Sequence, residues 1–141
     1  MKRPHYTLLK DIGDEGSIIV YYAPFERNRL QELAEAFPNH APHLLNMVDR
    51  LWDQLDIFKK HYRDYRFGKS NSLKSVLPII APKLSYQTLV VQDGTQAQVV
   101  WEEMINGEDT AVKSQLAAQL REYCHLDTQA MVEIHYTLQN T

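Results

Sequence analysis

The chain of 141 residues has the length of one domain, and its 44% apolar residues are enough for one hydrophobic core. Eighteen acidic residues against 15 Lys and Arg give a net charge of −3, which excludes a uniformly basic nucleic-acid coat protein. No apolar run approaches the roughly 18 residues of a membrane span, and the N-terminus lacks a signal-peptide pattern. The single cysteine, Cys124, excludes an internal disulfide and a cysteine-built zinc site, and it predicts a cytoplasmic protein.

The first part of the chain is predicted to run helix, strand, helix. Apolar residues at helical spacing over Tyr6–Ile12 predict a helix that ends at Gly13. Ser17–Tyr22 is a short continuous run of β-branched and aromatic residues, which predicts a strand buried on both faces. Pro24 fits the first turn of the following helix, and Pro38 ends that helix.

The middle of the chain is harder to divide into elements. Asn39 is expected to cap a helix with apolar positions through Leu55, which changes to a strand near Trp52 at a point that the pattern leaves open. Residues 59–69 have no clear period and predict a loop. Only one strand is therefore firmly predicted, and a sheet needs further partners.

The C-terminal half is predicted to be mainly helical. A short helix capped by Asn71 or Ser72 precedes Ser85–Val91, which fits either a strand or an extended loop. Two longer helices are predicted over about Gln96–Ile105 and Thr110–Leu138, the second with a possible break near its middle. The chain is thus helix-rich, with few strands.

The last predicted helix carries a carboxylate, Asp127, within an apolar stripe. A buried, ionised carboxylate without a partner costs several kcal/mol or more, so it needs a cation, strong donors or a shifted pKa. A metal ion is one such partner, and Tyr123 lies one turn away; the alternative is an edge position in solvent or against an arginine. The positions that share this face are Leu116, Leu120, Tyr123, Asp127, Met131 and Ile134.

Glu26 is the second candidate, because it opens a helix directly after a buried strand, where α/β folds bind ligands. An acid in the first helical turn is also favoured by the helix macrodipole alone. His40 and His43 fit a helix start better than a metal site. The neighbours Cys124 and His125 point about 100° apart on a helix, which argues against a cysteine hydrolase.

Basic and aromatic residues alternate in the segment 56–75. It holds six Lys and Arg residues against two Asp residues, and it includes Tyr62, Tyr65 and Phe67. Cations for phosphates beside aromatic faces for bases are the combination that single-strand binders use. A solvated loop anchored by its aromatic residues is an equally good interpretation.

Two segments carry a family resemblance. Ile19–Glu26 runs from a buried strand into Phe-Glu at a helix start, and Tyr123–Asp127 reads Tyr-x-x-x-Asp on a late helix. Together they resemble the second and third motifs of the DEDD superfamily of 3′–5′ exonucleases, the DnaQ-like group with a ribonuclease H fold. Residues 16–134 look closer still to an uncharacterised bacterial family of exonuclease-like domains found with predicted RecB-type nucleases. The matching segments are Gly16–Tyr21, Phe25-Glu26, Ser72–Pro78, Leu84–Tyr86, and the pairs Tyr123-Cys124 and Asp127-Thr128.

The resemblance implies that residues 1–141 form a single domain, the C-terminal part of an incomplete ribonuclease H-like α/β fold. Family members would hold two divalent ions, Mg²⁺ or Mn²⁺, with four acids, and Glu26 and Asp127 would be the third and fourth. Tyr123 would orient or deprotonate the attacking water. The implied substrate is a single-stranded 3′ end of nucleic acid.

Substrate contacts are expected around these acids. The resemblance implies that Phe25 packs behind the site. Charge and position alone suggest Lys69 and Lys74 as phosphate contacts, and Tyr65 as the aromatic residue that accompanies them.

The sequence departs from the family pattern in three places. The first motif, Asp-x-Glu on a strand, has no match before Gly16, so two of the four acids and the first strands are missing. Tyr22 stands where many members have Asn, and Glu26 is longer than the commoner Asp. We therefore expect little or no exonuclease activity from this chain alone. We also expect the open strand edges to pair with a second copy or an N-terminal segment.

Two other classes of function fit the same residues. One is a binding or assembly module that keeps the fold without catalysis, which Tyr22 and the unmatched first motif favour. The other is an unrelated helical interaction domain in which Glu26 and Asp127 are solvated. A separation of the two carboxylates within about 8 Å, facing one cavity, would support an ancestral metal site.

Overall fold

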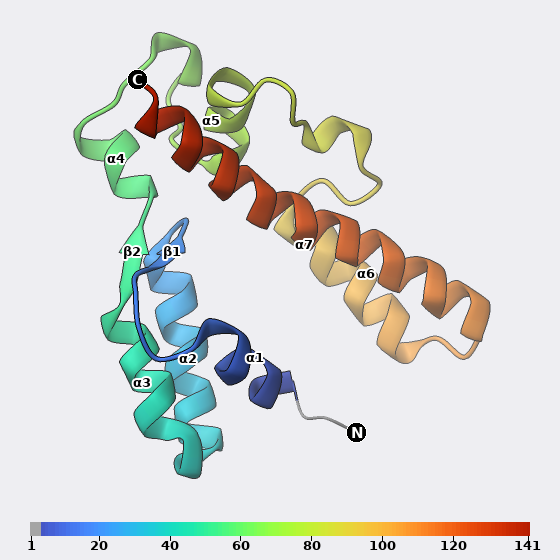
Figure 1. Ribbon diagram of the computed structural model, residues 1–141. Helices are drawn as coiled ribbons and strands as arrows, with labels where there is room; N and C mark the ends of the chain where they lie inside the picture. Colours follow the sequence, from blue (N-terminus) through green and yellow to red (C-terminus); the bar gives the residue numbers. More distant parts are fainter. Residues whose placement is uncertain (1–3) are drawn as a thin grey trace. The chain divides into compact units, whose positions relative to one another are not determined.

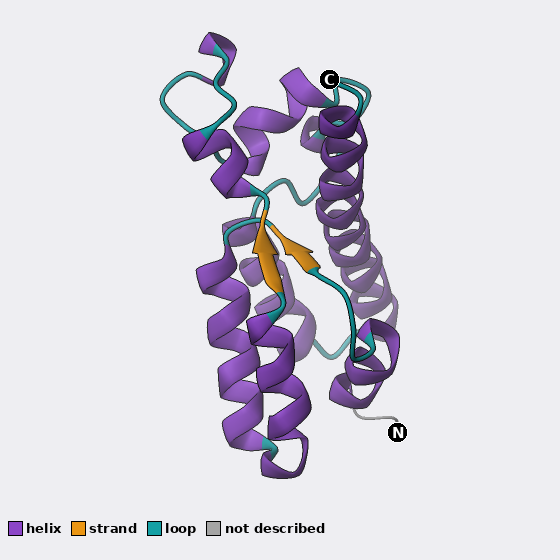
Figure 2. Ribbon diagram, turned by 60° about the vertical axis from the view of Figure 1, so that its left-hand side comes forward, coloured by secondary structure: helices purple, strands orange, loops and turns teal. Residues whose placement is uncertain are grey.

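A computed structural model describes residues 4–141 of the chain (Figure 1). Most of these residues are helical, and the strands are short (Figure 2). The backbone divides into two compact units, residues 4–63 and 64–141. None of the helices between residues 4 and 141 combines the length and the apolar character that crossing a bilayer demands.

The first unit contains a two-stranded parallel sheet between helices. Strands β1 and β2 pair with Ile18 opposite Leu51 and Val20 opposite Asp53. A parallel pair needs a long crossover connection, which α2 and α3 provide here (Figure 2). The expected pairing of the strand edges with a second copy stays a prediction. The elements are α1 (Pro4–Ile12), β1 (Ile18–Val20), α2 (Ala23–Ala36), a 3₁₀ turn (Pro38–His40), α3 (Ala41–Asp49), β2 (Leu51–Asp53) and α4 (Leu55–Lys60).

The core of this unit forms where α2 and α3 pack together. Leu30 and Ala34 of α2 meet Leu44 and Met47 of α3, and apolar residues of α1 cover this cluster. The predicted end of α1 is confirmed, since Gly13 has a φ of +68° and its N–H donates to the Leu9 carbonyl at 3.3 Å. The predicted place of Pro24, in the first turn of α2, is also confirmed.

Two predictions for this unit are wrong in part. The helix expected to carry apolar positions through Leu55 ends at Asp49, and His40 rather than Asn39 occupies its N-cap position. The change to a strand near Trp52 is confirmed, because β2 covers Leu51–Asp53. The predicted strand is only three residues long, and its first two residues are half-exposed rather than buried on both faces. The strand ends early because Tyr22 adopts a φ of +79°, in the left-handed region, before α2 begins.

The second unit is built on the long helix α7 (Thr110–Gln139). Helix α6 (Gly94–Asn106) returns alongside it as a helical hairpin, and α5 (Leu73–Ile80) packs against it (Figure 1). Two 3₁₀ turns complete the unit, η2 (Tyr65–Phe67) and η3 (Tyr86–Thr88). The buried apolar side chains of α5 and α7 are Val76, Leu77, Ile80, Leu126, Ala130 and Ile134.

The predicted helices of this unit are confirmed, with changes at their boundaries. Ser72 caps α5, because its hydroxyl accepts the Ser75 N–H at 3.3 Å. Helix α7 runs through His125 without a break. Ser85–Val91 forms a 3₁₀ turn and loop instead of a strand.

Candidate functional site

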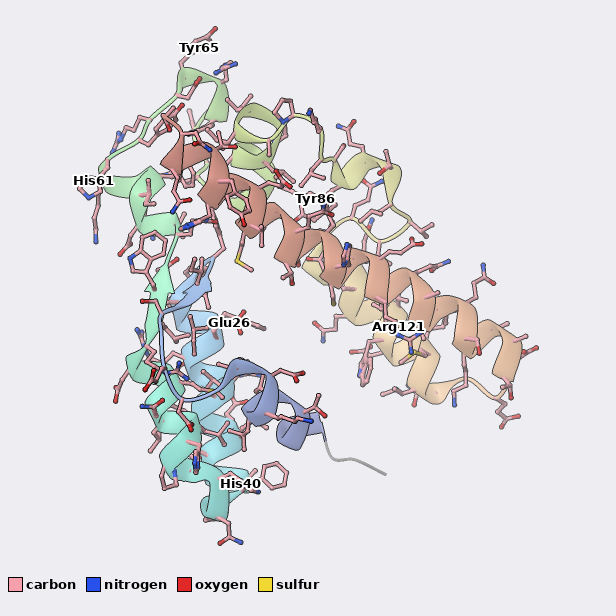
Figure 3. All side chains as sticks on the ribbon, in the orientation of Figure 1. Glu26, His40, His61, Tyr65, Tyr86 and Arg121 are labelled. Atoms are coloured by element: carbon pink, nitrogen blue, oxygen red, sulfur yellow. The ribbon has the colours of Figure 1, made fainter. Side chains whose placement is uncertain are left out.

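The carboxylate of Asp127 accepts hydrogen bonds from two tyrosine hydroxyls. Tyr86, on the turn η3 (Figure 3), donates to Oδ1 of Asp127. The second donor is the hydroxyl of Tyr123, one turn earlier on α7, which lowers the pKa of the same carboxylate. The two rings lie 6.1 Å apart between centroids, at an interplanar angle of 53°. Among the partners expected for Asp127, the structure therefore supplies strong donors.

Burial controls the protonation of this cluster. It raises the pKa of Asp127, while the hydrogen bonds from Tyr86 and Tyr123 lower that pKa by less. Burial, and then the charge of Asp127, raise the pKa of Tyr123 to about 12; burial and the bond to Asp127 also raise the pKa of Tyr86. Both hydroxyls therefore keep their protons at neutral pH, and the role of Tyr123 towards a water stays a prediction.

Tyr86→Phe is expected to raise the pKa of Asp127 further, since it removes a donor that lowers it. The folded chain already holds this proton more tightly than the unfolded chain does. The stability that Asp127 contributes is therefore fully present below its ordinary pKa and is lost as pH rises through the folded pKa. The variant should extend this loss to higher pH. NMR titration of the Asp127 carboxyl carbon measures the change; Tyr136→Phe, on an exposed part of α7, is the control, and an unchanged pKa would contradict the expectation.

A cavity of about 260 Å³ borders this cluster, and both Tyr86 and Lys74 line it. The ammonium nitrogen of Lys74 lies 3.7 Å from the carboxylate of Asp93, which also caps α6. The start of α6 is close to the site, since a β-carbon on Gly94 would lie 3.9 Å from the Tyr123 hydroxyl. Lys74, an expected phosphate contact, is thus brought to the same cavity as Tyr86.

Glu26 lies in the first unit, in the first turn of α2 (Figure 3). It follows β1 at the carboxyl edge of the parallel sheet, and burial raises the pKa of its carboxyl group. Asp127 belongs to the second unit, so a shared site for the two acids stays a prediction. In residues 4–141, no group of three or more His, Cys, Asp or Glu side chains converges as a metal site would require.

Phe25 is exposed on its helix, and its expected position behind the site stays a prediction. Its side chain is 58% exposed, and the guanidinium of Arg29 lies 5.7 Å from the centre of its ring. Phe25 occupies the open first turn of α2, where the next turn of the helix supplies its neighbour.

The basic and aromatic segment divides between packed and exposed side chains. Tyr62 packs edge-on against Phe58, with ring centroids 6.0 Å apart, and Phe67 is buried. The interpretation of a loop anchored by its aromatic residues therefore holds for Tyr62 and Phe67. Tyr65 is 92% exposed and Lys69 is exposed, so their proposed roles in substrate binding stay predictions.

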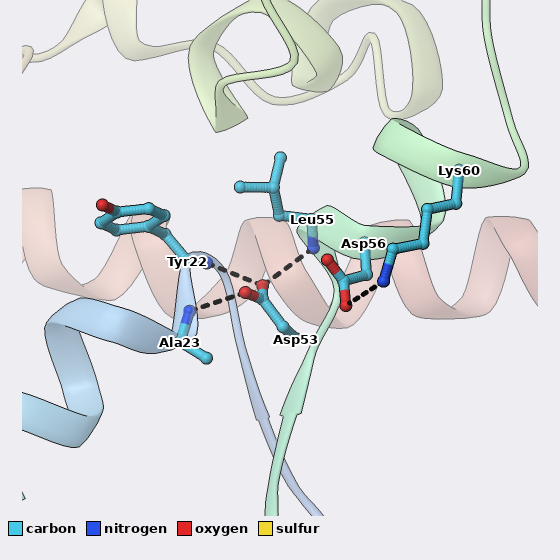
Figure 4. Close-up of polar contacts among 6 residues, drawn as sticks. All are labelled: Tyr22, Ala23, Asp53, Leu55, Asp56 and Lys60. Atoms are coloured by element: carbon cyan, nitrogen blue, oxygen red, sulfur yellow. Dashed lines mark hydrogen bonds and ion pairs between the residues drawn. The ribbon is translucent and has the colours of Figure 1, made fainter.

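Asp53 is a structural carboxylate that the sequence patterns did not single out. It stands at the end of β2 and accepts the backbone N–H groups of Tyr22 at 2.9 Å, Ala23 at 2.8 Å and Leu55 at 3.1 Å (Figure 4). One side chain thereby accepts hydrogen bonds from backbone N–H groups at the starts of both α2 and α4. Tyr86 was missed as a site residue too, although it lies in one of the segments that carry the resemblance.

The fold and these contacts define a helix-rich α/β chain with a carboxylate held by two tyrosine hydroxyls. The chain belongs to a family described as Domain of unknown function (DUF2779), whose family model matches residues 2–72, half of the chain. This agrees with the uncharacterised domain family that the sequence predicts. The expected relationship to DnaQ-like exonucleases stays a prediction.

Two curated relatives are similar over most of the chain. Uncharacterized protein MG366 homolog of Mycoplasma pneumoniae is 35% identical over 135 residues, which cover 86% of this chain and 20% of the relative. Uncharacterized protein MG366 of Mycoplasma genitalium is 31% identical over 147 residues, which cover 95% of this chain and 22% of the relative. The chain therefore spans about one fifth of the length of these relatives. No solved structure matches it.

Proposed function

We propose that the chain is part of a metal-dependent 3′–5′ exonuclease domain that acts on single-stranded nucleic acid. In this proposal Glu26 and Asp127 bind Mg²⁺ or Mn²⁺, and Tyr123 orients the attacking water. The observation that carries it is the half-buried carboxylate of Asp127, which two neutral hydroxyls hold. No Lys, Arg or His in the described part of the chain forms an ion pair with it.

The surroundings of both acids support this assignment. Each oxygen of a carboxylate offers two acceptor positions, so two tyrosine bonds leave Asp127 able to bind a cation. Glu26 follows a strand of a parallel β–α–β unit, at the edge where α/β folds place ligands. The left-handed backbone of Tyr22 is a conformation that Asn adopts more readily, which fits the Asn that many members of the resembled family have here.

Divalent ions bound at such a site would activate water and stabilise the leaving 3′ oxygen. The residues of this chain would supply the fixed geometry. Tyr86 restrains the Asp127 carboxylate from η3, and Tyr123 restrains it from α7. Lys74, which lines the neighbouring cavity, would contact a phosphate of the strand.

The proposal is tested by titrating the ¹⁵N-labelled chain with Mn²⁺ and recording the broadening of amide signals. We expect the signals around Glu26 and those around Asp127 to broaden at the same Mn²⁺ concentration, because one site contains both acids. Glu26→Gln and Asp127→Asn should each abolish the broadening at both places. This measurement detects weak, rapidly exchanging ions, which two carboxylates alone would hold.

The matched control is Glu32→Gln, which removes an acid from the same helix as Glu26. Glu32 forms an exposed ion pair with Arg29, so its loss should leave the Mn²⁺ effect unchanged at both places. Independent broadening around the two acids, or none at either, would contradict the proposed function.

A further inference from the structure

A second and larger cavity, of about 560 Å³, lies in the first unit. The first turn of α2, the strand β2 and the helix α4 border it, so it opens at the carboxyl ends of the two parallel strands. This volume falls within the range of about 300–1,000 Å³ that small-ligand pockets occupy. None of the residues assigned above to metal or substrate lines this cavity.

The charges in its wall leave the cavity positive. Asp53 is engaged by three backbone N–H groups, and Asp56 pairs with Lys60 at 3.0 Å (Figure 4). Arg27 and Lys59 also line the cavity, and neither forms an ion pair within the residues that the structure describes. Asp53 and Asp56 thus already have partners inside the protein, while the cations of Arg27 and Lys59 are available to an anionic ligand.

Two large aromatic side chains border the same cavity and keep much of their surface in solvent. Trp52 of β2 is 41% exposed, and Tyr22 before α2 is 52% exposed. Aromatic faces beside cations that are free to bind phosphate are the combination that holds single-stranded nucleic acid, through stacking and electrostatic contacts together.

We propose that this cavity binds a segment of single-stranded nucleic acid, with Arg27 and Lys59 on phosphates and Trp52 stacked on a base. The inference rests on the proposed function only in taking nucleic acid as the ligand; the binding itself needs no metal. It adds Arg27 and Trp52, which lie outside the basic segment 56–75, to the residues that hold the strand.

The test is fluorescence anisotropy of labelled oligo(dT) and oligo(U) with the whole chain in EDTA. Arg27→Gln combined with Lys59→Gln should weaken binding. It should also reduce the slope of log K against log salt by about 1.4, since each phosphate contact on a single strand contributes about 0.7. The control pair, Lys10→Gln with Lys83→Gln, removes two exposed charges elsewhere and should leave the slope unchanged.

Trp52→Ala should weaken binding roughly five- to a hundredfold, because it removes the stacking platform. Trp52→Phe should restore most of the affinity, and Trp101→Ala, at a comparably exposed tryptophan on α6, should have no effect. Circular dichroism confirms that each variant is folded. Binding of oligo(dT), of oligo(U) or of both supports the inference, since base stacking and phosphate contacts are available to DNA and RNA alike.

Three results would overturn the inference: wild-type binding by the folded cavity variants, an equal loss in the control pair, or equal binding of a duplex of the same length. If Mn²⁺ links Glu26 and Asp127 but the cavity variants bind normally, this inference fails and the proposed function stands. If the cavity variants lose binding but Mn²⁺ does not link the acids, the proposed function fails and the cavity remains a nucleic-acid site.

Discussion

Phe58→Ala is expected to reduce the free energy of unfolding by about 3–5 kcal/mol, measured by urea denaturation. The Phe58 side chain on α4 is fully buried, so its removal leaves a cavity as well as losing apolar burial. Its ring also packs against Tyr21 at 6.2 Å and Tyr62 at 6.0 Å between centroids, and these aromatic contacts are lost too.

The matched control is Tyr65→Ala, which removes an aromatic ring seven positions later in the same basic segment. Because Tyr65 is almost entirely exposed, this variant should change stability by no more than about 0.5 kcal/mol. A loss below about 1 kcal/mol for Phe58→Ala would show that Phe58 does not stabilise the core of the first unit.

Asp53→Ala is expected to reduce the free energy of unfolding by about 2–3 kcal/mol, because it leaves three backbone N–H groups without their acceptor. Two of these groups open α2 and the third opens α4, so both helix starts lose stability together. Asp53→Asn should fall between the wild type and Asp53→Ala, since an amide keeps only one acceptor oxygen. Urea denaturation monitored by circular dichroism measures all three proteins.

Asp56→Ala controls for the loss of an acid at the edge of the same cavity. Asp56 forms an exposed ion pair with Lys60, and such pairs contribute about 0–1 kcal/mol. Equal losses for Asp53→Ala and Asp56→Ala would mean that the backbone hydrogen bonds of Asp53 do not stabilise the helix starts.

The elements predicted correctly are those specified by residues close in sequence. Gly13 ends α1, Pro24 lies in the first turn of α2, and a sustained helical period identifies α7. The strand expected near Trp52 is confirmed as β2, but its first residue could not be placed because three residues carry too little pattern. It exists through pairing with β1, more than 30 residues earlier. The end of α3 could not be predicted for the same reason, because α3 stops where the residues of β2 pair with the distant strand β1.

The contacts of the candidate site likewise include some between residues close in sequence and some between distant residues. Tyr123 and Asp127 lie four residues apart on one helix, so their contact could be predicted from spacing alone. Tyr86 reaches Asp127 from 41 residues away, and Asp53 reaches the start of α2 from 31 and 30 residues away. Such contacts depend on how the helices pack, which the hydrophobic pattern of a single segment does not specify.

The two side chains that donate to Asp127, Tyr86 and Tyr123, are both uncharged, and this has an electrostatic consequence. A lysine or arginine at either position would also satisfy the carboxylate, but it would cancel its charge. Neutral hydroxyls fix the orientation of the oxygens and leave the negative field of the ionised group uncompensated. In the proposed function, the orientation of the carboxylate oxygens would therefore not depend on a bound cation.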